Sequence, residues 1–327
     1  MLYAGATDGI YRVTGVEGGN DFETTKVHDA GEVFRITQSE GIDGLFATTD
    51  TKLQYSPDGE EWMTLSLPEE EVYAVTASPS GEMLYAGTRP AKVYVAACNS
   101  GVPSDAEAWE EVDGFQELRE QTDWGIPRHD GLAQVRSLQT HPAAPDRIVV
   151  GIEVGGIYVS DDRGQTWTAR AIDGFDAPHT DDIHHIELVD EETMVASTGS
   201  GLYRSSDTGR TWERLDTDHY QRYFREALSH EGRIYAGGAP GSSSSWEEDT
   251  DHALFECENG KRLEQVSSPT PEEVAVGWCA SDDAVMTGTH HGTLLRRTSS
   301  GWESVGRILP SESTPVRYLP LSWVTAQ

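Results

Sequence analysis

Basic residues are scarce in this sequence. Its 327 residues include 56 aspartates and glutamates but only 24 lysines and arginines, which gives a formal net charge of −32. Only four of the basic residues are lysines: Lys26, Lys52, Lys92 and Lys261. A surface of this sign repels phosphate backbones and anionic headgroups, so we expect neither nucleic acid nor a membrane surface as a partner.

Cysteines and long apolar runs are also scarce. Cys98, Cys257 and Cys279 are far apart and form no CxxC motif, so the sequence indicates neither a zinc site nor a disulfide framework. No run of 18 apolar residues occurs, and no basic stretch with an apolar run precedes the strand-like start "MLYAGATDGIY". We therefore expect no membrane insertion, no signal peptide and a reducing, cytoplasmic location.

The acidic residues are spread along the whole chain. A tail of like charge would suggest an interaction arm, whereas an even spread makes the entire surface acidic. Self-repulsion of such a surface is tolerable where salt screens it, since the screening length falls to about 3 Å at 1 M salt. The composition therefore resembles that of halophilic archaeal proteins, and we expect a monomer.

One phrase recurs along the chain. It consists of a short apolar strand, a "LYAG"-like strand, a turn with glycine, a "GLYRS"-like strand and a segment that often opens on tryptophan. Apolar and polar residues alternate within these strands, which favours β-strands over helices. The "LYAG"-like strand occurs seven times, starting at Leu2, Leu45, Leu84, Ile148, Met194, Ile234 and Val285. Four short strands in a unit of about 40 residues are typical of a propeller blade.

The two ends of the chain predict how the ring closes. The sequence starts on a second strand and finishes on "VRYLPLSW" (316–323), which has the pattern of a first strand. We therefore expect an all-β, seven-bladed propeller of four-stranded blades, in which the C-terminal strand completes the N-terminal blade and no sheet edge stays open. Residues 1–327 then form one domain with blades at 316–323 plus 1–30, 33–68, 72–114, 135–173, 183–217, 223–268 and 274–309.

A motif of the form S-x-D-x-G-x-T-W occurs twice, at 160–167 and 205–212, with a shortened copy at 56–62 and a degenerate one at 298–302. This motif is the Asp-box, and the sequence resembles the WD40/YVTN/BNR-like propeller superfamily, which includes sialidases and photosystem II assembly factors. We interpret the motif as a structural turn clamp, in which aspartate accepts from turn amides, glycine gives backbone freedom and tryptophan packs between blades. The residues concerned are Ser160, Asp162, Gly164, Trp167, Ser205, Asp207, Gly209 and Trp212.

Alternating strand direction sorts the turns between two faces. Turns that join the first to the second strand, or the third to the fourth, lie on one face together with the Asp-boxes. The longest insertions, 114–133 and 238–252, belong to connections on the opposite face. Insertions gathered on one face often form a binding surface, so we expect a small anionic ligand or a protein partner there.

Arginine and histidine gather where the inner strands begin on that face. In so acidic a chain, this clustering predicts a positive channel mouth for a carboxylate or phosphate, unless each arginine pairs with an acid and ties blades together. The candidate ligand-binding residues are Arg35, Arg136, His184, His185, Arg225, Arg317 and Tyr318 from inner strands, with Arg89, Arg128, His129, Asp130, Glu153, His290 and His291 from loops.

Three functions are compatible with this cluster. The first is a non-catalytic binding propeller, since the chain has no GxSxG, HExxH or glycine-rich phosphate loop. The second is a lyase or hydrolase that acts on an anionic substrate with a divalent metal in the central channel. Its candidate ligands are His129, His185, His290 and His291.

The third function is a sialidase-like glycoside hydrolase. The resemblance to sialidases implies a tyrosine nucleophile, for which Tyr223 or Tyr318 is available. Two features depart from that family: sialidases have six blades, and they carry an Arg-Ile-Pro segment ahead of the first box. The only near match here is "GIPRHD", which lies out of order.

Overall fold

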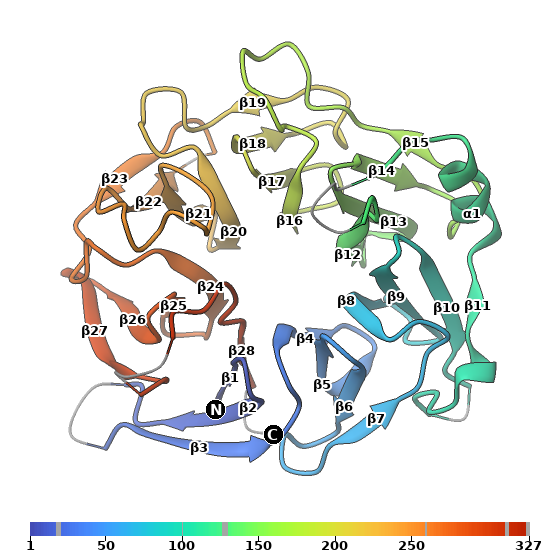
Figure 1. The fold of residues 1–327 in the computed structure, drawn as a ribbon, viewed down its shortest axis with the longest axis horizontal. Helices are drawn as coiled ribbons and strands as arrows, with labels where there is room; N and C mark the ends of the chain where they lie inside the picture. The colour runs from blue at the N-terminus through green and yellow to red at the C-terminus, as the bar shows by residue number, and fades with distance from the viewer. Residues whose placement is uncertain (18–20, 100, 126–129, 259, 311–313, 325–327) are drawn as a thin grey trace.

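Seven four-stranded antiparallel sheets surround a central axis (Figure 1). A computed structural model describes residues 1–17, 21–99, 101–125, 130–258, 260–310 and 314–324. The innermost strand of each sheet faces the axis, and successive strands lie farther out. The predicted all-β, seven-bladed propeller is therefore confirmed.

The first four sheets are built from the N-terminal half of the chain, except for β28, which comes from the C-terminus. From the axis outward, the first sheet has β28 (Leu321–Trp323), β1 (Leu2–Gly5), β2 (Ile10–Thr14) and β3 (Glu23–His28), and the second has β4 (Val33–Ser39), β5 (Ile42–Thr49), β6 (Leu53–Ser56) and β7 (Met63–Leu65). The third sheet has β8 (Glu71–Ala77), β9 (Met83–Arg89), β10 (Val93–Ala97) and β11 (Glu110–Glu111). The fourth sheet has β12 (Gln134–His141), β13 (Ala144–Glu153), β14 (Gly156–Ser160) and β15 (Thr168–Ala169).

The other three sheets follow the same plan. Their strands are β16 (Ile183–Leu188), β17 (Met194–Thr198), β18 (Gly201–Ser205) and β19 (Glu213–Arg214); β20 (Tyr223–His230), β21 (Arg233–Ala239), β22 (Ala253–Glu258) and β23 (Glu264–Val266); β24 (Ala275–Ala280), β25 (Val285–Thr289), β26 (Thr293–Thr298) and β27 (Gly301–Arg307). Two short helices, η1 (Ala106–Ala108) and α1 (Asp113–Glu120), interrupt the pattern. Among the described residues no helix is long and apolar enough to span a bilayer.

The "LYAG" phrase is explained by packing between blades. The second strands β1, β17 and β25 are buried along their whole length. A Cβ on Gly5 would lie 2.5 Å from Val33, and one on Gly87 would lie 2.4 Å from Val135, which are both at the start of the next inner strand. At these two positions only glycine lets adjacent sheets approach this closely. Five of the seven copies carry glycine there, and Thr48 and Ser197 occupy the position in the other two.

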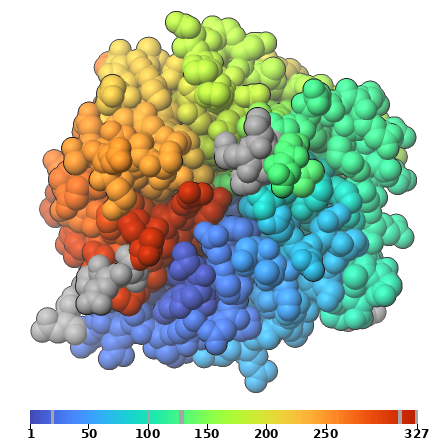
Figure 2. All heavy atoms as spheres, viewed as in Figure 1, coloured from blue at the N-terminus to red at the C-terminus, as the bar shows by residue number. Residues whose placement is uncertain are grey.

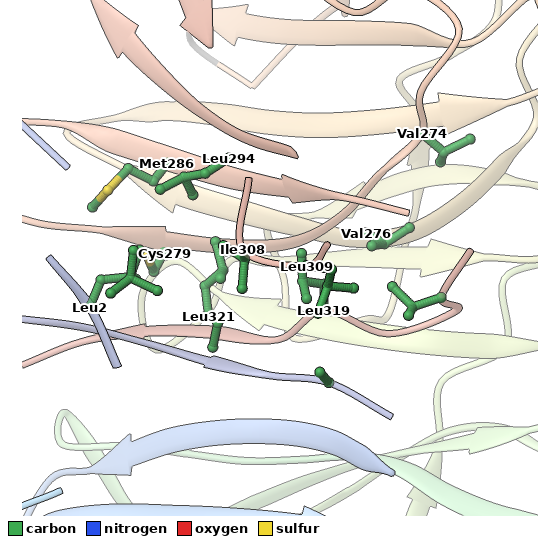
Figure 3. Packing of buried hydrophobic residues seen from close by; sticks show 14 of the residues in the cluster. Leu2, Val274, Val276, Cys279, Met286, Leu294, Ile308, Leu309, Leu319 and Leu321 are labelled. Atoms are coloured by element: carbon green, nitrogen blue, oxygen red, sulfur yellow. The ribbon is translucent and has the colours of Figure 1, made fainter. Parts of the chain in front are cut away.

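The ring closes where the two ends of the chain meet. Leu2 lies opposite Trp323 and Ala4 opposite Leu321 in the β1–β28 ladder, and the terminal ammonium of Met1 donates to the Val324 carbonyl at 2.7 Å. Figure 3 shows side chains from β1, β24, β25, β26 and β28 packed into one apolar cluster across this closure. The predicted completion of the N-terminal blade by the C-terminal strand is confirmed.

Part of the 114–133 insertion lies at the rim and not at the channel. Helix α1 is at the outer edge of the ring in Figure 1, and the buried Phe115 packs edge-on against Trp167 of the next blade, with 5.4 Å between ring centroids. This differs from the expectation that the whole insertion covers one face. The apolar Phe115 draws the start of the insertion into the gap between two blades.

Candidate functional site

The channel is lined at one end by residues that β-bulges push inward. Six inner strands carry a register shift near their first residues, at Phe34, Tyr73, Arg136, His184, Arg225 with Glu226, and Val276. A bulge adds a residue to one strand and re-aims its side chain. The bulged Phe34, Tyr73, Arg136 and Arg225 line a cavity of about 400 Å³, which we call the mouth cavity.

Arg136 is the centre of a buried polar network in this cavity. Its Nη1 donates to Glu153 Oε2 at 2.8 Å and to the Tyr318 hydroxyl at 2.6 Å, and Gln134 donates to the same carboxylate. Burial alone would raise the pKa of Glu153, but Arg136, His184 and Arg225 lower it to about 2. Glu153 is therefore ionised at neutral pH and fixes the Arg136 guanidinium in place.

Two further arginines of the mouth cavity are Arg225 and Arg317. Arg225 is 8% exposed, its Nη1 lies 3.3 Å from the Tyr223 hydroxyl, and its guanidinium also hydrogen-bonds Tyr318. Its Nη2 has no hydrogen-bond partner in the described part of the chain. Arg317 is exposed at the edge of the same cavity. A buried guanidinium nitrogen without an acceptor is costly, and an anionic ligand would supply the acceptor.

Tyr318 lies between two of these arginines. The guanidinium carbon of Arg225 is 4.5 Å from its ring centroid, and that of Arg136 is 5.0 Å away. Burial would raise the pKa of the Tyr318 hydroxyl, but the two positive charges outweigh it and lower this pKa below the ordinary value of 10.0. Phe34 packs edge-on against the same ring at 5.2 Å. Tyr318 therefore makes cation–π contacts with both arginines and forms an aromatic part of the cavity wall.

Acidic residues also line the mouth cavity, among the arginines. Its lining includes four arginines (Arg89, Arg136, Arg225 and Arg317) and five acids (Glu32, Asp50, Glu71, Glu153 and Asp182). Burial and the nearby Asp50 raise the pKa of Glu32, and Asp50 Oδ1 has no hydrogen-bond partner among the described residues. The cavity is therefore mixed in charge, and not the purely positive mouth expected from the arginines.

Three of these acids occupy a recurring position in the sequence that also predicts their place in the channel. Glu32, Glu71 and Asp182 each directly precede the first apolar residue of an inner strand. The blade register that located the arginines also locates these acids at the same end of the channel. Arg89 forms an ion pair with Glu71 inside one blade. This arginine therefore links two strands of the protein, which was the alternative to anion binding.

Adjacent inner-strand positions point to opposite ends of the channel. Arg35 and His185, which follow the bulged Phe34 and His184, line a second cavity of about 290 Å³ at the far end, and Glu187 and Glu226 also line it. All seven inner strands contribute to this opposite-end cavity. The structure therefore divides the predicted cluster of arginine and histidine between two sites.

The histidine candidates are dispersed. The buried His184 is held by Nδ1, which lies 2.7 Å from the Phe224 carbonyl, and its Nε2 is 3.6 Å from Asp182 Oδ1. His185 lies at the far end of the channel. His290 and His291 directly follow β25, and both face Glu247. Arg128 and His129 lie outside the described residues, and Asp130 is exposed in a turn with φ 55°.

The group of Glu247, His290 and His291 could hold a metal by distance alone, since their ligand atoms lie within 4.8 Å of one another. The protonation of His290 argues against it. Its Nδ1 accepts the Val274 amide at 3.0 Å, so the proton of the neutral ring is on Nε2, the atom that faces Glu247 at 3.2 Å. Burial first, then the neighbouring histidines, lower the pKa of His290 to about 4, so the ring is neutral. A protonated nitrogen cannot ligate a metal.

The Asp-boxes form closed turns away from both cavities. Asp162 Oδ1 accepts the Thr166 amide and the Ser160 hydroxyl, both at 2.8 Å, and the Gly164 amide donates to Ser160 Oγ at 2.8 Å. Trp167 Nε1 donates to the Gly164 carbonyl at 3.0 Å. The 205–212 motif repeats the aspartate, serine and glycine bonds with Asp207, whereas Trp212 Nε1 has no hydrogen-bond partner among the described residues. Every polar atom of the aspartate is used within its own turn, which is a structural arrangement.

Comparison with solved structures shows the fold. The chain is similar to the GH74 xyloglucanase from Xanthomonas campestris (TM-score 0.63, 13% identity, 98% of this chain and 52% of that chain) and to a GH74 enzyme from Niastella koreensis (TM-score 0.61, 14% identity, 83% and 45%). It is also similar to YCF48 bound to D1 peptide (TM-score 0.56, 14% identity, 83% and 81%). The chain spans about half the length of these GH74 structures.

No family model matches the sequence, and no curated protein matches it. The resemblance predicted from the Asp-boxes therefore holds at the level of structure: this is a seven-bladed propeller similar in fold to the GH74 xyloglucanase and to YCF48. Identities of 13–14% carry no further statement about activity.

Proposed function

We propose that this protein is a non-catalytic binding propeller that holds the anionic group of a ligand or protein partner in the mouth cavity. The observation that carries the proposal is Arg225, a buried guanidinium whose Nη2 lacks a hydrogen-bond acceptor among the described residues. Arg317 at the cavity edge supplies a second cation. Two guanidinium groups around one cavity suit a carboxylate or a phosphate.

The rest of the cavity narrows the class of ligand. Asp50 and Glu32 line the same cavity as the arginines and offer acceptors to hydroxyl or amine donors. The rings of Phe34 and Tyr73 stack 4.4 Å apart and form an apolar wall. A ligand with one anionic group and several hydrogen-bond donors, such as a sugar acid or a peptide end, can pair its anionic group with the arginines and its donors with the acids.

The likeness to YCF48, whose structure contains a bound D1 peptide, supports the reading that a propeller of this kind binds a protein segment. Residues 242–244 also line the mouth cavity, so part of the 238–252 insertion is in place to contact such a segment. Figure 2 shows this face, on which the red C-terminal segment meets the blue N-terminal part of the chain near the centre.

Calorimetric titration in 0.5 M salt tests the proposal, with glucuronate, inorganic phosphate and a short peptide ending in a free carboxylate as probes. Glucose, which lacks the charge of glucuronate, is the ligand control. We expect Arg317→Gln to weaken anion binding about tenfold, and Arg225→Gln by more, because each removes a charge-assisted hydrogen bond of about 1.5–3 kcal/mol. Arg317 is exposed, so its variant keeps the fold.

The matched protein control is Arg163→Gln. This residue lies in an Asp-box turn, 61% exposed and paired with Asp146, so its loss changes the net charge equally without touching the cavity. Equal effects of Arg317→Gln and Arg163→Gln would overturn the proposal, as would the absence of binding by all three probes. Binding of the peptide alone would assign a protein partner, and binding of glucuronate or phosphate would assign a small ligand.

The lowered pKa of the Tyr318 hydroxyl favours one alternative, a glycoside hydrolase that uses this oxygen as its nucleophile. A 4-nitrophenyl glycoside of an acidic sugar tests it, since release of nitrophenol that is lost in Tyr318→Phe would identify an enzyme. The metal-dependent alternative has less support, because the described histidine candidates lie at separate places and His290 presents a protonated nitrogen.

A further inference from the structure

The opposite-end cavity differs from the mouth in its chemistry. Its charged and titratable lining comprises Arg35 from β4, His185 and Glu187 from β16, Glu226 from β20 and Cys279 from β24. The inner strands β8, β12 and β28 contribute Thr76, Gln139 and Ser322, which carry no charge. Two carboxyl groups face one arginine at this end of the channel.

His185 presents an unused acceptor to this cavity. The side chain is 4% exposed, and its Nδ1 has no hydrogen-bond partner among the described residues. The ring also interacts with the Ala227 backbone, while burial and the nearby Arg35 lower the pKa of the ring well below its ordinary value. The ring is therefore neutral, so one of its nitrogens offers a lone pair, and Nδ1 is the nitrogen that has no partner among the described residues.

Glu187 and Glu226 are half-buried carboxyl groups that line the same cavity. Glu187 accepts the Ser229 amide at 2.9 Å, and Glu226 lies 3.7 Å from Arg35 Nη1, which is longer than a hydrogen bond. Burial first, and then the charge of the partner carboxylate, raise the pKa of Glu187 to about 8. The pair therefore retains a proton at neutral pH that a bound cation would displace.

We propose that the opposite-end cavity binds the ammonium end of a primary alkylamine, with His185 Nδ1, Glu187 and Glu226 as hydrogen-bond acceptors. Three acceptors match the three donors of an ammonium group. Leu228, Trp278 and Leu138 supply apolar wall for the alkyl part. A compact metal site is less suitable, because the one group of three ligand atoms within 4.8 Å among the described residues is that of Glu247, His290 and His291.

Titration calorimetry with n-butylamine tests this proposal in 1 M NaCl, where a screening length of about 3 Å removes diffuse binding to the acidic surface. Nα-acetyl-lysine N-methylamide is the second probe, because a lysine side chain carries the same group. Binding of both probes points to a lysine of a partner, and binding of butylamine alone points to a small amine. Tetramethylammonium and 1-butanol, which lack the charged donors, should not bind.

We expect Glu187→Gln to weaken butylamine binding at least tenfold at pH 9, whereas Glu264→Gln, an exposed acid on β23, leaves it unchanged. Wild-type affinity should rise about tenfold from pH 7 to pH 9 as Glu187 gives up its proton, while the amine stays charged. Glu226→Gln gives a second, independent test should the first variant fold poorly. Absence of one-site binding, or equal effects of Glu187→Gln and Glu264→Gln, would overturn the proposal. Arg317→Gln should not change amine binding, which separates this test from that of the mouth cavity.

Discussion

Replacing Glu187 with glutamine should change how stability depends on pH. In the folded protein the pKa of this carboxyl is about 8 against an ordinary value of 4.5, with burial as the main cause. The folded state thus binds a proton that the unfolded state releases between these two values. The stabilising effect of this proton is complete below pH 4.5 and is lost as the pH rises through 8.

The magnitude follows from the two pKa values. Linkage gives a loss of about 2.5 kcal/mol between pH 6 and pH 9 for a group that titrates in this way. Water in the adjoining cavity reduces this, so we expect about 2 kcal/mol. Glu187→Gln keeps an acceptor for the Ser229 amide and has no proton to lose. The variant should therefore be about 2 kcal/mol more stable relative to wild type at pH 9 than at pH 6.

Urea unfolding followed by tryptophan fluorescence measures this difference at several pH values in 1 M NaCl. His185 acts in the opposite direction below pH 6.5, because its pKa is lowered in the folded state, but it is present in both proteins and cancels in the comparison. Glu264→Gln is the control for the loss of one acidic charge. Parallel stability curves for wild type, Glu187→Gln and Glu264→Gln from pH 6 to pH 9 would refute the reasoning.

Three further predictions concern stability. Glu153→Gln should cost about 3 kcal/mol because it leaves the buried Arg136 unpaired; the double variant with Arg136→Gln should recover part of this in a double-mutant cycle by urea unfolding. Asp162→Ala should cost about 1–2 kcal/mol through loss of the turn hydrogen bonds, whereas Asp176→Ala, at an exposed position, should cost nothing measurable by the same assay. Because the net charge is −32, the thermal midpoint should rise between 0.1 M and 2 M KCl in a calorimetric scan, and a flat response would contradict the halophilic interpretation.

The repeat phrase was sufficient to predict the fold. The glycine of "LYAG" contacts the next blade, as Gly5 does with Val33, and the alternation within strands fixes which side is buried. The pattern "VRYLPLSW" at the C-terminus likewise predicted that β28 would pair with β1. These features are local in the sequence and repeat seven times, so each copy supports the others.

The division of the site between two cavities could not be predicted in the same way. Adjacent residues such as Phe34 and Arg35 reach opposite ends of the channel because a bulge lies between the strand start and the regular ladder. Bulges have no residue pattern of their own in this sequence. In β20, Arg225 and Glu226 stand against the single residue Gly237 of β21; this bulge places Arg225 at the mouth and Glu226 at the far end, which only the register of β20 with β21 shows.

The location of a bound oxyanion tests the central claim most directly. Crystals of the protein soaked with selenate would show the anion by its anomalous scattering. The account predicts an anomalous peak in the mouth cavity about 4 Å from Arg225 Nη2, which places a selenate oxygen within about 3 Å of that nitrogen, with Arg317 turned toward it. Selenate bound only at the outer surface, with Arg225 Nη2 paired to an acid of the protein, would contradict the account.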